Sequence, residues 1–435
     1  METVNRLYEQ IISQIDYSRE IPNEEIKERI DQVIGEESKK ALISVAERQR
    51  LRRELFARIR ELDILQEMID DPEITEIMVN GTEPIFIEKR GELFITENRF
   101  DSQDKLMQVI QQIVAQCNRT VNEASPIVDA RLQNGSRVNV VLPPIALNGP
   151  ILTIRRFPEQ PITMEQLILD HSLTGEASEL LRLLVRAGYN ILISGGTGSG
   201  KTTFLNALAG YIPSTERILV VEDSSELQIR NIPNLVRMET RNVNVEGCKP
   251  ITIRDLIKTS LRMRPSRIIV GEVRGSETID MLQALNTGHS SMTTCHANSA
   301  KDVVSRLETM VLMGMDFPIE AIRRQIASAL DIIVHLGRLR DGSRHVLEIV
   351  EIFGYCQGEV TFHPLYSFEE YEEEQEEGSP VQHPEAQEED LPARGKKQKD
   401  NNTIKGRLQK KGELQHVQKL KASGLWKGAK EGDTL

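Results

Sequence analysis

Apolar residues follow a helical spacing through the first 68 positions of the chain. They lie three or four residues apart with charged residues between them: Leu7, Ile11, Ile12 and Ile15, then Leu51, Leu55, Ile59, Leu62 and Leu65. Such spacing gathers apolar side chains on one face of a helix. We therefore predict a helical N-terminal region over residues 1–60, and nothing in it indicates chemistry.

From Ile74 the spacing changes to that of strands. Short apolar runs there end at turn residues such as Asn80-Gly81. Five runs predict strands, the second and third forming a hairpin, at Ile74–Val79, Ile85–Ile87, Leu93–Ile95, Val138–Leu142 and Ile151–Ile154. A helical pattern from Leu106 to Val114 lies among them, so residues 61–160 are expected to form a small α+β domain.

Beyond Pro158–Gly175, which we interpret as a linker, strand and helix patterns alternate. The predicted strands are Ile191–Ser194, Ile218–Val221, Leu235–Met238, Ile268–Val270, Met292–Cys295 and Ile332–Leu336. The predicted helices are Glu176–Arg186, Thr252–Met263, Glu277–Leu285, Asp302–Leu312 and Pro318–Leu330. This alternation is typical of a parallel sheet with helical crossovers. The fold class of residues 165–365 is therefore α/β, with a closing hairpin at Val346–Ile352 and Val360–Phe362.

Residues 366–435 break with this order. Tyr366–Asp390 holds eleven acidic residues and no basic one, and Leu391–Leu435 holds twelve Lys and Arg against four Asp and Glu, a net charge of +8. Few apolar residues accompany these charges, so we predict a mostly disordered tail, with room for one short helix around Ile404–Leu420.

Length and composition narrow the class of protein. The chain has 435 residues, 39% hydrophobic and 28% charged, as in a soluble protein of two or three domains. No apolar run is long enough to span a membrane and no signal-peptide core follows Met1, so we expect a cytoplasmic protein. The four cysteines include no C-x-x-C pair, which argues against a zinc ribbon or disulfides. The net charge of −12 disfavours a general nucleic-acid binder.

One stretch carries a specific chemical signal. It matches the phosphate-loop pattern G-x-x-x-x-G-K-[ST] in full, with Gly195, Gly196, Thr197, Gly198, Ser199, Gly200, Lys201 and Thr202. The stretch lies between a predicted strand and a predicted helix, where loop N–H groups and the helix dipole attract an anion. Lys201 is expected to reach the β- and γ-phosphates of ATP and the Thr202 hydroxyl to bind Mg²⁺, with Thr203 as a further nucleotide contact.

Two of the following strands end in acids. Ile218–Val221 is followed by Glu222-Asp223, and Ile268–Val270 is followed by Gly271-Glu272. Ligands bind at the carboxyl ends of strands in open α/β sheets, so both acids can face the phosphate. Glu272 is expected to hold Mg²⁺, directly or through water, and Glu222 to orient and deprotonate the attacking water. The pattern leaves open which acid is the base, and acids without a function are also common at strand ends.

Two histidines, His289 and His296, flank a Ser/Thr-rich strand within Gly288–Asn298. They make an incomplete metal set because no acidic ligand lies nearby in the sequence. The more specific interpretation is that they include a sensor of the γ-phosphate at the strand end. The simpler interpretation is that both histidines are purely structural.

These motifs in this order resemble the type II/IV secretion ATPase superfamily. Its Walker A, Asp box, Walker B and His box correspond to Gly195–Thr202, Glu222-Asp223, Ile268–Arg274 and Gly288–Asn298, and its N-terminal arginine motifs to Arg131–Val140 and Ile154–Phe157. The resemblance covers roughly residues 60–365. The C-x-x-C pairs of the general-secretion branch are absent. The helical N-terminus and Val221–Leu227 resemble the CpaF branch, which is linked to tight-adherence (Flp-type) pili.

The resemblance implies a homo-hexameric ring that acts from the cytoplasm on a polytopic inner-membrane platform protein. Each subunit would pair a PAS-like N-terminal domain with a RecA-like ATPase domain. By motif, Glu222 becomes the expected base, Glu272 the Walker B acid, and His296 a neighbour of the γ-phosphate with His289 behind it. Three arginines of the N-terminal domain become candidates for stabilising charge during hydrolysis: Arg137, Arg155 and Arg156.

Other functions stay open. A conjugative-type ATPase for DNA or protein transfer would use the same chemistry, and a nucleotide-gated scaffold would turn over slowly. A RecA-like DNA motor needs a basic loop with interleaved aromatics, and aromatics make up only 4% of the chain, so no specific nucleic acid is expected. The basic half of the tail could contact an anionic membrane, although a solvated tail without a role is the simpler interpretation.

Overall fold

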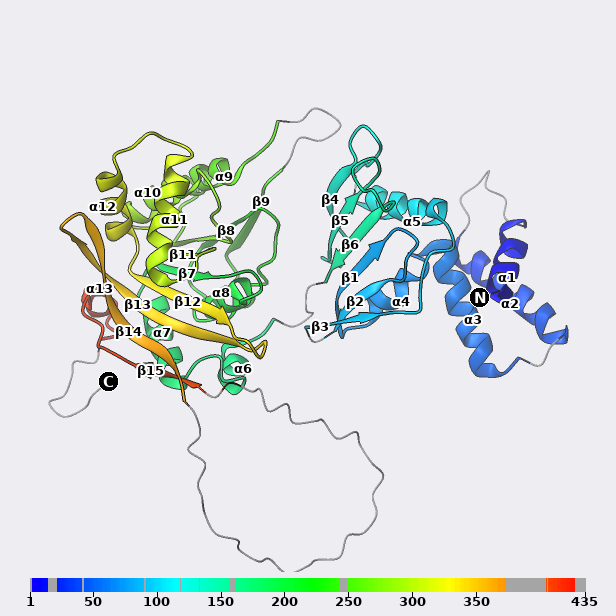
Figure 1. Cartoon of the computed structure of the whole chain (residues 1–435), viewed down its shortest axis with the longest axis horizontal. Helices are drawn as coiled ribbons and strands as arrows, with labels where there is room; N and C mark the ends of the chain where they lie inside the picture. The colour runs from blue at the N-terminus through cyan, green and yellow to red at the C-terminus, as the bar shows by residue number, and fades with distance from the viewer. Residues whose placement is uncertain are drawn as a thin grey trace, which may run out of the picture. The chain divides into compact units, whose positions relative to one another are not determined.

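The computed structural model (Figure 1) describes residues 2–14, 22–40, 43–89, 91–117, 119–132, 134–156, 161–241, 249–371, 404 and 406–426. The described residues divide into two compact units, one up to residue 160 and one from Pro161 onward. Among the described residues, no helix is both long enough and apolar enough to cross a membrane.

The first unit begins with three helices, α1 (Glu2–Ile12), α2 (Asn23–Lys40) and α3 (Val45–Arg60). Their buried residues come from the helically spaced apolar positions and form one small core, with Leu7, Ile30 and Leu55 fully buried. Each helix alone has too narrow an apolar face to be stable, so the three cover one another. The predicted helical N-terminus is confirmed.

A six-stranded sheet forms the rest of the first unit. Its strands are β1 (Ile74–Asn80), β2 (Phe86–Lys89), β3 (Glu92–Ile95), β4 (Ile127–Arg131), β5 (Arg137–Val141) and β6 (Ile151–Arg155), and their order is β3-β2-β1-β6-β5-β4. All neighbours are antiparallel. The core of this part combines apolar residues of the sheet with those of α5 (Gln103–Gln116) and of the short α4 (Leu65–Asp70). The predicted α+β organisation is confirmed, but the helices and the sheet belong to one unit.

The second unit is built on a nine-stranded sheet in the order β15-β14-β13-β12-β7-β11-β10-β8-β9. Six strands are parallel to their neighbours within this group: β7 (Ile191–Gly195), β8 (Ile218–Glu222), β9 (Leu235–Glu239), β10 (Arg267–Val270), β11 (Ser290–Cys295) and β12 (Ile332–Arg338). Three further strands extend the sheet beyond β12, each antiparallel to its neighbour: β13 (Arg344–Cys356), β14 (Glu359–Glu370) and β15 (Gly406–Lys410). The predicted α/β class is confirmed, with a mixed sheet.

Helices cover both faces of this sheet. Ile191 and Ile193 of β7 point into one core and Leu192 into the other, because side chains alternate along a strand. One core includes α6 (Met164–Leu169), α7 (Gly175–Arg186) and α8 (Lys201–Ala209). The other is covered by α9 (Ile253–Ser260), α10 (Thr278–Asn286), α11 (Ala300–Leu312) and α12 (Ile319–Ala329), and Figure 1 shows α10, α11 and α12 gathered on one side of the sheet. A strand buried on both faces needs a continuous apolar run, and the sequence has one.

Part of the segment expected to be a linker is folded. The helix α6 lies inside Pro158–Gly175, and its Met164 is buried in the same core as α7 and α8. The prolines that suggested a linker precede this helix, and proline is compatible with the chain just before a helix begins.

The predicted disorder of residues 366–435 is wrong for two stretches. The strand β14 extends to Glu370, and residues 406–426, here called the C-terminal segment, fold onto the second unit. The strand β15 pairs with β14, and the short helix α13 (Gln418–Ala422) follows, with Leu408 only 5% and Leu420 only 3% exposed. Composition missed this because the segment has too few apolar residues to fold alone, whereas the edge of β14 offers backbone partners. The acidic stretch at 372–390 lies outside the described residues.

Candidate nucleotide-binding site

The phosphate loop links the central strand β7 to the helix α8. Gly195 ends the strand, Gly200 (φ +91°) caps the helix, and Lys201 is the first helical residue. Residues 196–198 of the loop are exposed, while the side chain of Ser199 turns inward and donates to the Gly196 carbonyl at 2.9 Å. Both Thr202 and Thr203 lie half-buried on the first turn of α8. The loop therefore presents backbone N–H groups and a helix N-terminus to one open surface, as phosphate binding requires.

The ammonium group of Lys201 lies inside the loop. Its Nζ donates to the carbonyl oxygens of Gly195 at 3.1 Å and Gly196 at 2.9 Å, and it lies 3.2 Å from Nδ1 of His296. Burial lowers the pKa of Lys201, and the nearby carboxylate of Glu272 opposes that shift. This lysine is thus held at the place where phosphate oxygens would arrive.

The carboxylate of Glu272 is the centre of a charged cluster. Its Oε1 lies 3.1 Å from Nε2 of His296, and its Oε2 accepts a hydrogen bond of 2.7 Å from Arg274. Burial, and then the charge of Lys201, lower the pKa of His296, which favours the neutral imidazole. The imidazole of His296 thus lies within reach of both the Lys201 ammonium group and the Glu272 carboxylate.

Strand order explains why these three residues meet. The strand β11 lies between β7 and β10, with Cys295 level with Ser194 and Val270 level with Thr293. Parallel neighbours end at the same edge of the sheet, so the residues that follow them converge there. Lys201, Glu272 and His296, predicted from the sequence to face the phosphate, are brought together.

Glu222 is placed differently from the other acid. It ends β8, which lies beyond β10, and its side chain packs against Gly271. The residue is only 3% exposed, and its Oε1 accepts the backbone N–H groups of Glu226 at 2.8 Å and Leu227 at 2.9 Å. Burial raises the pKa of Glu222 although these two hydrogen bonds lower it. Its carboxylate is therefore engaged in closing the turn after β8.

The expected position of His289 behind His296 is wrong. His289 precedes the first residue of β11, whereas His296 follows its last, so the two lie at opposite edges of the sheet. Nδ1 of His289 lies 3.1 Å from the hydroxyl of Thr287. The sequence pairs the two histidines, but a strand of six residues extends about 20 Å and keeps them apart.

The three arginines of the first unit differ in what they contact. Arg137 on β5 and Arg155 on β6 are direct partners across the two strands, so their side chains share one face of the sheet. Arg155 lies 3.5 Å from Glu76, and its side chain is 60% exposed. Arg156 instead donates to the carbonyls of Asp71 and Ile74, which ties it into its own unit. Phe157, the last residue of that motif, lies outside the described residues.

One residue next to the loop has no signal in the sequence. Arg344, the first residue of β13, donates from Nε to the carbonyl of Gly198 at 2.9 Å. It follows an ordinary turn at Asp341-Gly342-Ser343, more than 140 positions after the loop. Only the placement of β12 beside β7, with β13 returning next to β12, brings it there.

Magnesium fits this edge of the sheet. The Thr202 hydroxyl and the Glu272 carboxylate offer the oxygen ligands that Mg²⁺ prefers, and the ion commonly takes only one or two protein ligands with water and phosphate completing the set. The described residues contain no group of three or more His, Cys, Asp or Glu arranged to hold a metal without a nucleotide.

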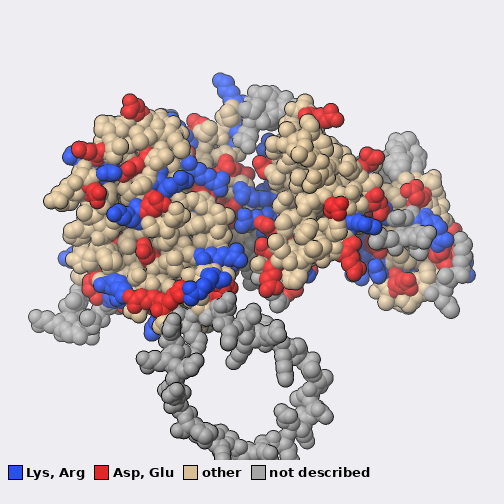
Figure 2. All heavy atoms as spheres, in the orientation of Figure 1, with Lys and Arg blue, Asp and Glu red and all other residues tan. Residues whose placement is uncertain are grey.

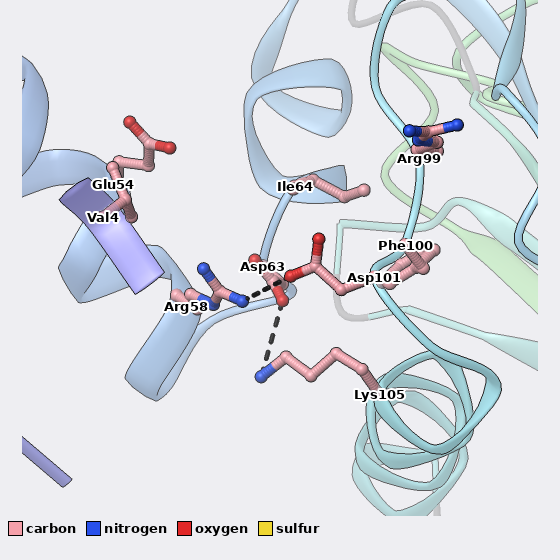
Figure 3. A pocket seen from close by; sticks show the side chains of 9 residues that line it. All are labelled: Val4, Glu54, Arg58, Asp63, Ile64, Arg99, Phe100, Asp101 and Lys105. Atoms are coloured by element: carbon pink, nitrogen blue, oxygen red, sulfur yellow. Dashed lines mark hydrogen bonds and ion pairs between the residues drawn. The ribbon is translucent and has the colours of Figure 1, made fainter. Parts of the chain in front are cut away.

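A charged cleft in the first unit is a separate feature (Figure 3). Arg58 donates to Asp101 at 2.8 Å, and Lys105 lies 3.4 Å from Asp63. Both cations also lie over the ring of Tyr8. These contacts link α1 and the end of α3 to α5. The other two charged residues of the lining, Glu54 and Arg99, have opposite signs, so the cleft carries no net charge for a ligand.

A family model described as "Type II/IV secretion system protein" matches residues 59–404. The chain belongs to the type II/IV secretion system family. Among its relatives, a putative conjugal transfer protein of Mycobacterium tuberculosis is 34% identical over 305 residues, which are 68% of this chain and 86% of that protein. The VirB11 protein of Brucella abortus is 32% identical over 66% of this chain and 88% of its own length. PtlH of Bordetella pertussis, also named a type IV secretion system protein, is 32% identical over 67% and 93%.

Two solved structures are among those similar to this chain. The VirB11 ATPase of Brucella suis in complex with sulphate is 29% identical over 66% of this chain and 95% of its own, with a TM-score of 0.37. The pilus retraction motor PilT with bound ADP is 21% identical over 70% and 82%, with a TM-score of 0.49. The family assignment confirms the predicted superfamily, and the CpaF branch remains a prediction.

Proposed function

We propose that this chain is a Mg²⁺-dependent ATPase that acts as the motor of a secretion or pilus-assembly machine. The observation that carries the proposal is the cluster of Lys201, His296 and Glu272 on a complete phosphate loop, at the carboxyl edge of three adjacent parallel strands. Names of relatives, among them VirB11 of a type IV secretion system, support the same function.

The residues of the cluster suggest a separate role for each in ATP binding and hydrolysis. The loop N–H groups and Lys201 would hold the β- and γ-phosphates, and Mg²⁺ near Thr202 would neutralise developing charge. His296, 3.1 Å from Glu272, would help to keep that carboxylate oriented. Arg137 and Arg155, from the first unit, are the proposed source of additional positive charge during transfer.

The contacts favour Glu272 over Glu222 as the base. A base must have a carboxylate oxygen available to the attacking water. Glu222 is only 3% exposed and its Oε1 accepts two backbone N–H groups, whereas the Glu272 side chain is 20% exposed and lies within the Lys201–His296 cluster, where water can reach it. Glu222 would then shape the turn beside the site and act on hydrolysis indirectly.

Steady-state turnover and affinity for a slowly hydrolysed ATP analogue test these roles. We expect Glu272→Gln to bind the analogue nearly as well as the wild type and to lower kcat by about 10²–10⁴-fold, the range for losing a general base. Lys201→Ala should lose both binding and turnover. If Glu222→Gln instead gives the larger loss of kcat with binding intact, the role of base belongs to Glu222.

The machine served by the motor is a finer proposal. We favour assembly of Flp-type pili through a polytopic inner-membrane platform protein, with a homo-hexamer of this chain at the cytoplasmic face. A conjugative-type secretion ATPase is the second candidate, and the name of the mycobacterial relative favours it. Turnover in the presence of platform-containing vesicles, compared with duplex and single-stranded DNA, separates a platform-driven motor from a DNA motor. A slow scaffold would respond to neither.

The surface gives little support to a DNA motor. On the face shown in Figure 2, Lys and Arg are interspersed with Asp and Glu over the second unit and form no continuous basic stripe. Nucleic-acid binders usually gather positive charge along one face. In the C-terminal segment, Lys411 pairs with Glu369 and Lys419 with Asp331, so less of the tail's basic charge is available to an anionic membrane than composition suggested.

A further inference from the structure

The side chain of Arg344 contacts the phosphate loop. Its Nε donates to the Gly198 carbonyl at 2.9 Å, and its Cδ lies 3.5 Å from where a Cβ on Gly200 would be. The arginine thus spans the part of the loop just before Lys201. None of the expected phosphate, acid or histidine motifs includes it.

The hairpin that carries Arg344 is itself fixed. Arg344 is level with Arg338 across β12 and β13, and β12 runs parallel to β7 up to Gly195. In the turn, Asp341 accepts from the backbone N–H and the hydroxyl of Ser343, at 2.9 and 2.5 Å. A backbone N–H from outside the hairpin, that of Ile404, also donates to Asp341 at 2.9 Å. A guanidinium mounted on a fixed turn can hold a flexible partner in place.

The part of the phosphate loop that Arg344 contacts is flexible because it contains glycine. Gly198 has a φ of +72° and no Cβ, so the peptide between Gly198 and Ser199 could rotate at little cost. Because a trans peptide is planar, fixing the Gly198 carbonyl toward Arg344 directs the Ser199 N–H the opposite way. That N–H has a long hydrogen bond of 3.4 Å to the Gly196 carbonyl, which a phosphate oxygen can replace. A charged donor on the carbonyl also strengthens the N–H as a donor.

We propose that Arg344 is a positioning residue for the phosphate loop, acting through the Gly198 carbonyl to aim the Ser199 N–H at the nucleotide phosphates. The proposal rests on the proposed ATPase function. It predicts that Arg344 controls the affinity for nucleotide diphosphates and triphosphates, because the loop contacts are made before and after hydrolysis. The rate of the chemical step at saturation depends mainly on the Glu272 cluster and changes less.

The test compares three variants of the full chain. Arg344→Gln removes the charge and the Nε donor, and Arg344→Lys keeps a cation that can reach a carbonyl. Arg340→Gln is the matched control, because Arg340 is on the same hairpin and pairs with Glu370 at 2.9 Å, away from the loop. Affinities for Mg-ADP and for a slowly hydrolysed ATP analogue are measured by calorimetry, kcat and KM by steady-state turnover, and the melting temperature without nucleotide.

We expect Arg344→Gln to weaken binding of both nucleotides about tenfold, as for a lost hydrogen bond to a charged donor, and to raise KM with kcat within about threefold. Arg344→Lys should recover most of the affinity, and Arg340→Gln should match the wild type. Equal affinities for Arg344→Gln and Arg340→Gln would overturn the proposal, as would a loss explained by a lowered melting temperature. A wild-type chain that binds no nucleotide would instead refute the ATPase function on which it rests.

Discussion

Replacing Glu351 with alanine should release the C-terminal segment from the second unit. Glu351 lies on β13 with only 1% of its surface exposed, and its carboxylate accepts the backbone N–H groups of Gln415 at 2.9 Å and His416 at 2.7 Å. The imidazole Nδ1 of His416 lies 3.0 Å from the same carboxylate, and the Tyr189 hydroxyl donates to the His416 carbonyl at 2.5 Å. One buried acid therefore anchors the connection between β15 and α13.

The contacts give a magnitude for the loss. Each N–H that loses this buried acceptor costs about 1–3 kcal/mol, so two of them cost about 2–6 kcal/mol while the segment stays in place. Detachment avoids that cost but exposes Leu408 and Leu420, at about 1.5–3 kcal/mol each. The segment takes whichever route costs less, and we expect its opening equilibrium to rise by at least 2 kcal/mol, about 30-fold.

Hydrogen exchange followed by mass spectrometry measures this opening directly. Residues 406–426 should lose protection in Glu351→Ala while the strand β7 keeps it, and trypsin should cut sooner at Lys410 and Lys419. Glu359→Ala is the control, because Glu359 is exposed at the start of β14. Unchanged exchange and cleavage in Glu351→Ala would refute the anchoring argument.

Three further outcomes are expected. Gly195→Ala should lower nucleotide affinity at least tenfold in calorimetry, because φ is +155° there and a Cβ would lie 2.5 Å from the Leu336 carbonyl; wild-type affinity would contradict this. Cys295 should resist alkylation at pH 8 in the folded chain while the exposed Cys356 reacts, because burial raises the pKa of the Cys295 thiol to about 12 and only a thiolate is reactive; intact-mass spectrometry reads the adducts, and equal labelling would refute it. A protein of residues 161–435 should bind nucleotide but hydrolyse it slowly, because it lacks the arginines of the first unit, and full-length turnover by that protein would eliminate their proposed role.

Local sequence determined the elements and the main chemical motif. The strand β7 and the loop after it follow from an apolar run and a fixed pattern of Gly and Lys, both of which act over a few residues. The helical N-terminus and the alternation of strands and helices are local in the same way. For these elements, side-chain spacing alone specifies which face is buried, and the structure agrees.

Tertiary structure decided which of the predicted site residues meet. The order of β7, β11 and β10 places His296 and Glu272 beside Lys201, whereas the length of β11 separates His289 from them. The turn after β8 takes up the carboxylate of Glu222. These outcomes depend on strand neighbours far apart in the chain, which no local pattern encodes.

The contributions from the end of the chain were also decided only by tertiary structure. Arg344 reaches the phosphate loop through a hairpin that packs beside β7, and the C-terminal segment folds only against the edge of β14 and the buried Glu351. A segment with few apolar residues cannot offset its own loss of conformational entropy, so its sequence resembles that of a disordered tail. The partner surface supplies the hydrogen bonds and the apolar contacts that it lacks by itself.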